Sequence, residues 1–276
     1  MSNQIVKEAS YQEFYVKNDT VKLYCRRYGK GKPLLLIHGA ACDCDFFATT
    51  AAYLARFYTV YTYDRRGYNR SSKPEKGDYS LTVQAEDAQK ILDFIGAPCF
   101  IVAHSAGTLI AMELLSRFQP DIPGMLLHEP PTGNLFPAEG KPTQLKKEML
   151  ALIEKGKYHA AASKFLQLMG PMDPRTPQRS DEELEQNYEN LLQTVRCELK
   201  DIYLYTPEYE ALRSYPVLVA VGEHSSADEV NIVKETAKQL SCSMLYFPGQ
   251  HNCAFDLPFE FAVNVRGALS FLESNY

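Results

Sequence analysis

The chain has 276 residues, of which 45% are hydrophobic and 23% are charged, and its formal net charge at pH 7 is -5. This composition is that of an ordinary globular protein and argues against a disordered or fibrous chain. The acidic balance argues against nucleic acid or an anionic membrane as the main partner, and no apolar run approaches the roughly 18 residues that a membrane span needs.

The first segments of the chain predict a hairpin. Residues 1–5 carry neither the basic nor the apolar stretch of a secretory signal, so we expect a cytoplasmic protein. Residues 13–17 and 21–25 read as two short strands. Asn18 and Asp19, which stand between them, tolerate positive φ, so a tight turn is the expected connection.

After this hairpin, short apolar runs alternate with segments of helical periodicity. The runs are typical of strands buried on both faces, as in a parallel sheet. They are residues 34–37, 59–63, 100–103, 125–127, 217–221 and 244–247. The helical segments are residues 46–57, 81–95, 108–118, 227–240 and 259–272. The alternation predicts an α/β fold, with a mostly parallel sheet and helices on both of its faces.

One stretch, residues 132–213, interrupts the alternation. It contains no convincing strand, and its helical segments are residues 145–154, 158–169 and 182–203. An all-helical insertion between two strands predicts a lid over the carboxyl ends of the strands, where such sheets bind ligands. We therefore expect a core domain of residues 1–131 and 214–276 with a helical cap of residues 132–213. The alternative is that these helices pack on the sheet and take no part in binding.

Ser105 stands where the predicted strand 100–103 turns into a helix. A serine on such a turn is held in a strained conformation with its hydroxyl exposed. The turn also needs small neighbours, and Ala103 and Gly107 provide them. The backbone N–H of Ala106 lies at the helix N-terminus, where it can stabilise a developing oxyanion. The alternative role of Ser105 is that of a plain helix N-cap.

Two further segments carry chemistry that fits a serine nucleophile. Gly39 follows His38 after the strand 34–37 and lets the backbone approach a substrate oxygen, which makes the N–H of Ala40 a candidate second oxyanion donor. His251 lies on the loop after the last predicted strand. A histidine there can act as the general base towards a serine hydroxyl if a carboxylate orients its ring.

Taken in order, five segments resemble the α/β-hydrolase superfamily. They are His38-Gly39-Ala40, residues 63–71, residues 103–107, residues 216–222 and Gly249-Gln250-His251. The resemblance covers essentially the whole chain and implies an eight-stranded, mostly parallel sheet, a helical lid inserted after strand 6 and a Ser-His-acid triad. Two departures are mild: Ala103 and Asn69 stand where glycine is usual. Asparagine, like glycine, tolerates positive φ.

A third departure concerns the acid of the triad. In most members of the superfamily an aspartate stands three residues after the glycine that ends the seventh strand, and here that place holds Ser225. We favour Glu129 as the replacement, because it follows the predicted sixth strand, where one subgroup of haloalkane dehalogenases and the zearalenone-type lactonases have their acid. Asp228 remains the alternative acid.

The cysteines give no sign of a metal centre or of disulfide pairing. Seven cysteines are scattered along the chain, which is an odd number and no disulfide framework. Cys42 and Cys44 form a C-x-C pair, but no second Cys/His pair stands at the spacing of a zinc site. We therefore expect no metal and no organic cofactor.

Together with the resemblance, these residues imply a serine hydrolase that cleaves a carboxylic ester or lactone through an acyl-enzyme. The resemblance makes Ser105 the nucleophile, His251 the base and Glu129 the acid. We expect a small, largely apolar substrate as the partner, and we make no prediction of the oligomeric state. Two alternatives stay open: a carbon–carbon bond hydrolase or thioesterase with the same site, and a non-catalytic ligand-binding protein on a hydrolase scaffold.

Overall fold

The computed structural model describes residues 10–19, 21–74, 77–169 and 172–275. Residues 1–5, on which the expectation of no secretory signal rests, lie outside the described residues. Within the described ranges, no helix is both long and apolar enough to cross a membrane. The expected cytoplasmic location stays a prediction.

The centre of the molecule is an eight-stranded sheet with the order β1-β2-β4-β3-β5-β6-β7-β8. Its strands are β1 (Tyr11–Asn18), β2 (Val21–Tyr28), β3 (Lys32–Ile37), β4 (Tyr58–Tyr63), β5 (Phe100–His104), β6 (Met125–His128), β7 (Val217–Gly222) and β8 (Ser243–Phe247). The predicted hairpin is β1–β2, and β2 pairs antiparallel with β4 as well. In the sheet order β4-β3-β5-β6-β7-β8, every pair of neighbouring strands is parallel. The predicted fold class is therefore confirmed.

The sheet is buried on both faces, as its continuous apolar strands predict. In β3, Leu34 and Leu36 belong to one core, whereas Leu35 and Ile37 belong to the other. Successive side chains of a strand point to opposite faces, so one apolar run supplies both cores. Each fully buried leucine or isoleucine contributes about 1.5–3 kcal/mol relative to an exposed one.

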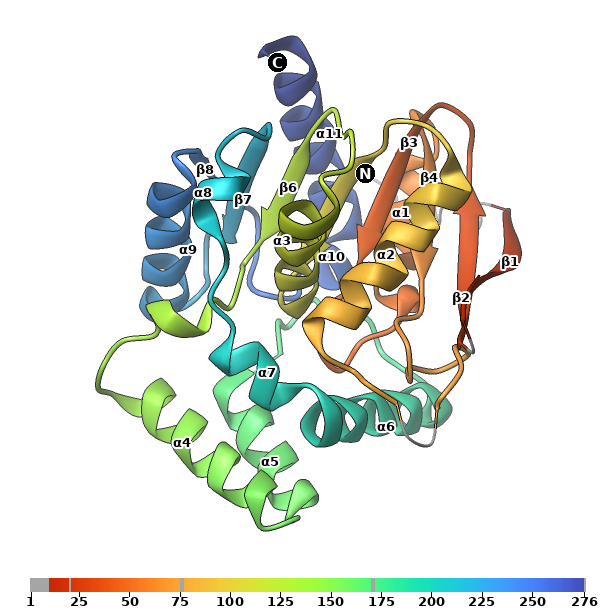
Figure 1. The fold of residues 1–276 in the computed structure, drawn as a ribbon. Coiled ribbons are helices and arrows are strands. Elements are labelled where there is room, and N and C mark those ends of the chain that lie inside the picture. The colour runs from red at the N-terminus through yellow and green to blue at the C-terminus, as the bar shows by residue number, and fades with distance from the viewer. Residues whose placement is uncertain (1–9, 20, 75–76, 170–171, 276) are drawn as a thin grey trace.

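Helices cover both faces of the sheet (Figure 1). On one face lie α2 (Leu81–Ile95), α3 (Ala106–Phe118) and α9 (Ala227–Leu240). On the other lie the 3-10 helix η1 (Cys44–Phe47), α1 (Ala48–Leu54), α10 (Cys253–Asp256) and α11 (Pro258–Asn275).

Helix α2 shows how the local sequence sets an element. Ser80 caps its N-terminus, since its hydroxyl accepts a hydrogen bond from the Val83 N–H. Gly96 ends it in the left-handed conformation, at φ 67°. Between these signals one face of the helix is buried, and α2 has the bounds that periodicity predicts.

The predicted insertion lies between β6 and β7 and is helical. It contains η2 (Gly133–Leu135), α4 (Lys141–Glu154), α5 (Tyr158–Met169), α6 (Asp181–Cys197), α7 (Leu199–Leu204) and α8 (Tyr209–Leu212). Figure 1 shows α4 to α7 together at one end of the sheet, below α2 and α3. The structure thus agrees with an inserted helical segment, whereas its role as a lid stays a prediction.

Two stretches predicted as single helices are divided in the structure. The stretch 182–203 was expected to be one helix, but the structure breaks it at Glu198, whose φ is -128°. The carboxylate of Glu198 is buried there against Arg65, a partner that periodicity does not reveal. The stretch 46–57 is also divided, into η1 and the shorter α1.

Candidate active site

Ser105 occupies the sharp turn between β5 and α3. Its backbone has φ 51° and ψ -127°, a conformation that costs a non-glycine residue about 1–3 kcal/mol. The turn is held on both sides, because the Ser105 N–H donates to the His128 carbonyl at 2.9 Å and its carbonyl accepts from the Thr108 N–H at 2.9 Å. The sharp turn predicted from the sequence is present.

The turn packs against the loop that follows β3. A Cβ atom on Gly107 would lie 2.5 Å from the Ile37 carbonyl oxygen and 2.6 Å from that of His38. A Cβ atom on Gly39 would lie 2.9 Å from the Ser105 Cβ. Glycine at these two positions therefore lets the loop after β3 reach the serine.

Gly107→Ala is expected to lower the free energy of unfolding by about 1–3 kcal/mol, because the new methyl group meets backbone atoms that cannot turn away. Urea denaturation monitored by circular dichroism measures this change. Gly267→Ala is the matched control, since nothing lies within 4 Å of a Cβ at that position in α11. Alanine there should stabilise the helix by up to about 1 kcal/mol, and equal losses in the two variants would contradict the crowding argument.

His251 and Glu129 form a close pair. The His251 Nδ1 atom lies 2.5 Å from Oε2 of Glu129, and their side chains are 16% and 2% exposed. Glu129 follows β6 directly and has φ 51°, so a second strained residue lies at the site. Its other oxygen accepts hydrogen bonds from the Gly222 N–H at 2.7 Å and from the Ser225 hydroxyl at 2.5 Å.

These contacts set the charge of the pair. Burial opposes ionisation of Glu129, but the hydrogen bond and the positive charge of His251 outweigh it and lower the pKa of Glu129 to about 2. Burial also opposes the charge of His251, and there the hydrogen bond and charge of Glu129 raise its pKa above the ordinary value of 6.5. Near neutral pH the pair therefore holds a carboxylate next to an imidazole that readily takes a proton.

The structure does not bring the alternative acid to His251. Asp228 lies in the first turn of α9 and lines the same cavity, but no hydrogen bond or ion pair joins it to the imidazole, whose carboxylate partners are Glu129 and Glu229. A different carboxylate from this turn comes closer, because Oε1 of Glu229 lies 3.9 Å from the His251 Nδ1. Ser225, at the position where the resemblance leads us to expect the acid, instead donates a hydrogen bond to Glu129.

The two candidate oxyanion donors come from two different segments next to Ser105. Ala106 begins α3, where the first N–H groups have no partner within the helix. Ala40 lies on the loop that packs against Ser105. Both residues line the cavity with Ser105, and neither N–H has a hydrogen-bond partner among the described residues.

A family model described as the alpha/beta hydrolase fold matches residues 32–256. The chain belongs to the α/β-hydrolase family.

Relatives agree with this family. The chain is 29% identical to YraK, an uncharacterized hydrolase of Bacillus subtilis (strain 168), over 233 residues that cover 81% of this chain and 83% of YraK. A fluoroacetate dehalogenase of Burkholderia sp is 36% identical over 92 residues, which cover 32% of this chain and 30% of that protein. The solved structure of Est816, an N-acyl homoserine lactone degrading enzyme, matches with a TM-score of 0.71 at 24% identity. The match covers 92% of this chain and 99% of the Est816 chain. That structural likeness shows the fold.

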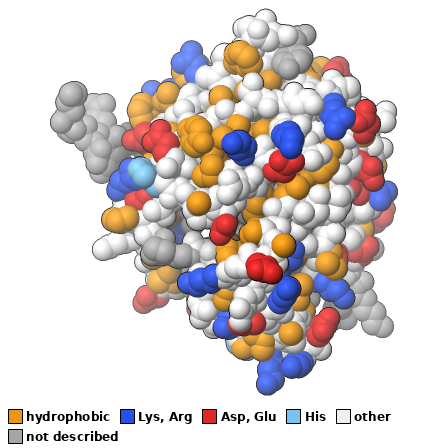
Figure 2. Space-filling view, turned by 90° about the vertical axis from the view of Figure 1, so that its left-hand side faces the viewer, with side chains coloured by type: hydrophobic (Ala, Val, Ile, Leu, Met, Phe, Trp, Pro, Cys, Tyr) orange, Lys and Arg blue, Asp and Glu red, His pale blue; other side chains and the backbone are white. Residues whose placement is uncertain are grey.

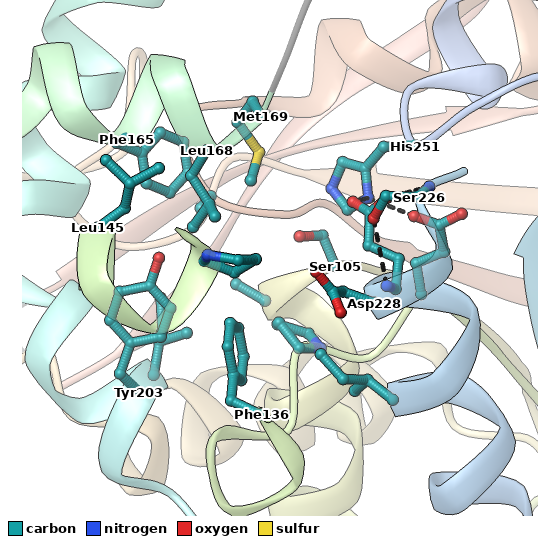
Figure 3. Close-up of a pocket in the computed structure, with 18 of the residues that line it drawn as sticks. Ser105, Phe136, Leu145, Phe165, Leu168, Met169, Tyr203, Ser226, Asp228 and His251 are labelled. Atoms are coloured by element: carbon teal, nitrogen blue, oxygen red, sulfur yellow. Dashed lines mark hydrogen bonds and ion pairs between the residues drawn. The ribbon is translucent and has the colours of Figure 1, made fainter. Parts of the chain in front are cut away.

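The cavity of this α/β-hydrolase has a volume of about 210 Å³ and opens beside Ser105. Its walls come from the core and from the helical segment 132–213 together. Figure 3 shows Phe165 and Leu168 of α5 on the side away from His251, with Phe136 below. The carboxylate side chains in the lining are Glu129, Asp228 and Glu229, of which Glu129 and Glu229 lie within 4 Å of His251. The outer face shown in Figure 2 mixes hydrophobic side chains with charges of both signs.

Two buried histidines, His104 and His128, directly precede the candidate site residues Ser105 and Glu129 in the chain. His104 and His128 are 1% and 0% exposed, and their Nδ1 atoms lie 3.1 Å apart. The His104 ring lies 4.7 Å from that of His251, and burial lowers the pKa of His128 to about 4. Both rings are therefore neutral near pH 7. The signal for them is that each ends a strand next to a site residue.

Among the described residues, one group has the composition of a cation site. It consists of Glu129, Glu229 and His251, whose ligand atoms lie within 4.8 Å of one another. The 2.5 Å contact between Glu129 and His251 leaves no space for an ion between them. The arrangement fits a charge-orienting hydrogen bond better than a metal.

Proposed function

We propose that this α/β-hydrolase is a serine hydrolase that cleaves a carboxylic ester or lactone. The observation that carries the proposal is the 2.5 Å contact of His251 with Glu129, next to a strained Ser105 in the same cavity. A base that a carboxylate orients, lining the same cavity as a serine hydroxyl, is the arrangement that activates serine.

The proposed reaction has two steps. His251 takes the proton of Ser105 as its Oγ attacks the carbonyl carbon, and the resulting oxyanion accepts hydrogen bonds from the N–H groups of Ala40 and Ala106. The imidazolium then gives the proton to the departing alkoxide, which leaves an acyl-enzyme. Water, deprotonated by His251, then attacks this ester, and the imidazolium returns the proton to the Ser105 Oγ as the acid is released. Glu129 holds the imidazole tautomer and balances its charge throughout.

The cavity supports a small, largely apolar substrate. Its volume of about 210 Å³ lies below the roughly 300–1,000 Å³ of typical ligand pockets. Because α5 and α7 supply part of its wall, we propose that residues 132–213 form a cap on a core of residues 1–131 and 214–276. The lactone-degrading activity in the description of Est816 is compatible with this choice of substrate.

A fluorophosphonate probe tests the proposal directly. Such probes bond to activated serines, so we expect stoichiometric labelling of the folded protein at Ser105, located by peptide mass spectrometry. Heat-denatured protein is the control and should remain unlabelled. Folded protein that takes up no probe would support the binding-protein alternative. A panel of ester, thioester and carbon–carbon substrates separates the remaining hydrolase classes.

The pH profile gives a further prediction. Only neutral His251 accepts the serine proton, so kcat/KM should rise with pH through the pKa of this residue. Since Glu129 raises that pKa, the midpoint should lie above 6.5. Initial rates from pH 5 to 9 at low substrate concentration measure it. Glu129→Gln removes the negative charge and should move the midpoint of the residual activity to lower pH, so an upward or absent shift would count against the pair.

A further inference from the structure

One face of α6 carries polar side chains where a covering helix would ordinarily be apolar. Asn190, Thr194 and Glu198 follow one another at intervals of four residues, which places them on one side of the helix and its C-cap. Their exposed fractions are 1%, 0% and 2%. Buried polar groups cost free energy unless they are hydrogen-bonded, so this polar stripe implies specific partners.

The first two members of the polar stripe bond to the loop that follows β3. The Asn190 side-chain amide donates to Oδ2 of Asp43 at 3.0 Å. The Thr194 hydroxyl oxygen accepts a hydrogen bond from the Ala41 N–H at 2.8 Å. Ala41 has φ 56°, a left-handed conformation that alanine rarely adopts without external support.

The third member acts through an arginine. Oε2 of Glu198 accepts hydrogen bonds from Nη1 of Arg65 at 2.9 Å and from the Tyr68 hydroxyl at 2.8 Å. Arg65 is 1% exposed, and its Nη2 atom donates to the Gly39 carbonyl oxygen at 3.0 Å. Its backbone N–H also donates to Nε2 of His38 at 3.0 Å.

The contacts therefore converge on the two peptide groups that flank Ala40. The Gly39 carbonyl oxygen accepts a hydrogen bond from Arg65, and the Ala41 N–H donates one to Thr194 of the helical segment. The N–H of Ala40 belongs to the same peptide group as the Gly39 carbonyl, and it has no hydrogen-bond partner among the described residues. We propose that Thr194 and Glu198 are positioning residues that fix the Ala40 N–H as an oxyanion donor.

This inference rests on the proposed function, and it gives the helical segment a role besides enclosing substrate. A donor must lie within 2.7–3.1 Å of the oxyanion, and a misplacement of about 1 Å can cost about 100-fold in rate. The transition state is affected more than the ground state, because the negative charge on the oxygen develops only there. Loosening the loop should therefore lower kcat and leave KM nearly unchanged.

Thr194→Val tests the proposal, since valine keeps the shape of threonine and removes the acceptor for the Ala41 N–H. We expect kcat for a p-nitrophenyl ester to fall by about 10- to 100-fold. A trifluoromethyl ketone forms a tetrahedral adduct with the serine, and its inhibition constant should rise by a similar factor. This constant does not depend on the amount of folded enzyme, so a loss of stability alone would not change it.

Thr236→Val is the matched control. Thr236 is also fully buried, its hydroxyl donates to the Ile232 carbonyl at 2.9 Å, and it makes no contact with the loop after β3. It should lose stability like Thr194→Val while keeping kcat and the inhibition constant. Glu198→Gln, which keeps the size and removes the charge that holds Arg65, should repeat the Thr194→Val pattern in weaker form.

The outcomes separate this inference from the function on which it rests. A wild-type protein that hydrolyses the ester, together with Thr194→Val and Glu198→Gln variants whose kcat and inhibition constants match it, would overturn the positioning role alone. The same holds if Thr236→Val weakens the inhibitor as much as Thr194→Val does. A wild-type protein that neither turns over the ester nor binds the ketone would overturn the serine-hydrolase proposal, and with it this one.

Discussion

Ser105→Ala is expected to lower kcat for a p-nitrophenyl ester by about 10⁶-fold, the loss seen when a triad nucleophile is removed. Alanine has no oxygen to attack the carbonyl, whereas the two N–H donors and the apolar cavity remain. Binding of substrate should therefore persist while turnover is lost. Steady-state rates and equilibrium binding of a non-hydrolysable analogue measure the two effects separately.

The matched control for this variant is Ser116→Ala. Ser116 lies in the same helix, and its hydroxyl donates to the Met112 carbonyl at 2.9 Å, away from the cavity. It should keep kcat close to that of the wild type. If Ser105→Ala turned over the ester at a comparable rate, the nucleophile would have to be sought elsewhere.

Glu129→Gln should lower kcat by about 10⁴-fold, the effect of removing the charge that orients the base in serine proteases. Glutamine fits the same space and can still accept from the Gly222 N–H, so the fold should be retained. The amide, however, cannot balance an imidazolium, and it permits the wrong tautomer of His251. The kcat of purified, folded variant at the wild-type pH optimum gives the comparison.

Asp228→Asn is the matched control for the acid, because it removes a carboxylate from the wall of the same cavity. His251 forms its ion pairs with Glu129 and Glu229 and none with Asp228, so kcat should stay near the wild-type value. A large loss in Asp228→Asn with little loss in Glu129→Gln would reverse the assignment of the acid. Comparable losses in both would indicate that the overall negative charge near the imidazole matters more than the hydrogen bond.

Much of the fold follows from the sequence because the signals are local. The strands are continuous apolar runs, and α2 is bounded by a serine and a glycine that cap it. The break at Glu198 could not be predicted in this way, since it depends on Arg65, which lies 133 residues away in the chain. Short helices such as α8 and α10 are equally invisible to periodicity, because four residues make barely one turn.

For the site, too, the features with a local sequence signal were predicted, and those that depend on contacts between distant residues were left open or missed. Ser105 and Gly107 carry a local signature, since the sharp turn between strand and helix requires small neighbours around the candidate nucleophile. The acid was left between two residues because a carboxylate and a histidine 122 positions apart leave no common local pattern. The polar stripe of α6 escaped notice for a related reason: Asn190, Thr194 and Glu198 resemble an exposed helix face until their partners are known.

The contact between Ser225 and Glu129 limits which side chains position 225 can hold. The Ser225 hydroxyl lies 2.5 Å from a Glu129 oxygen, so an aspartate at 225 would place two carboxylates against each other. Two such groups cannot both stay ionised, and one would hold a proton near neutral pH. The two strand ends therefore share space for a single negative charge. Ser225→Asp is therefore expected to impair the enzyme unless Glu129 is neutralised in the same variant, as in Ser225→Asp with Glu129→Gln.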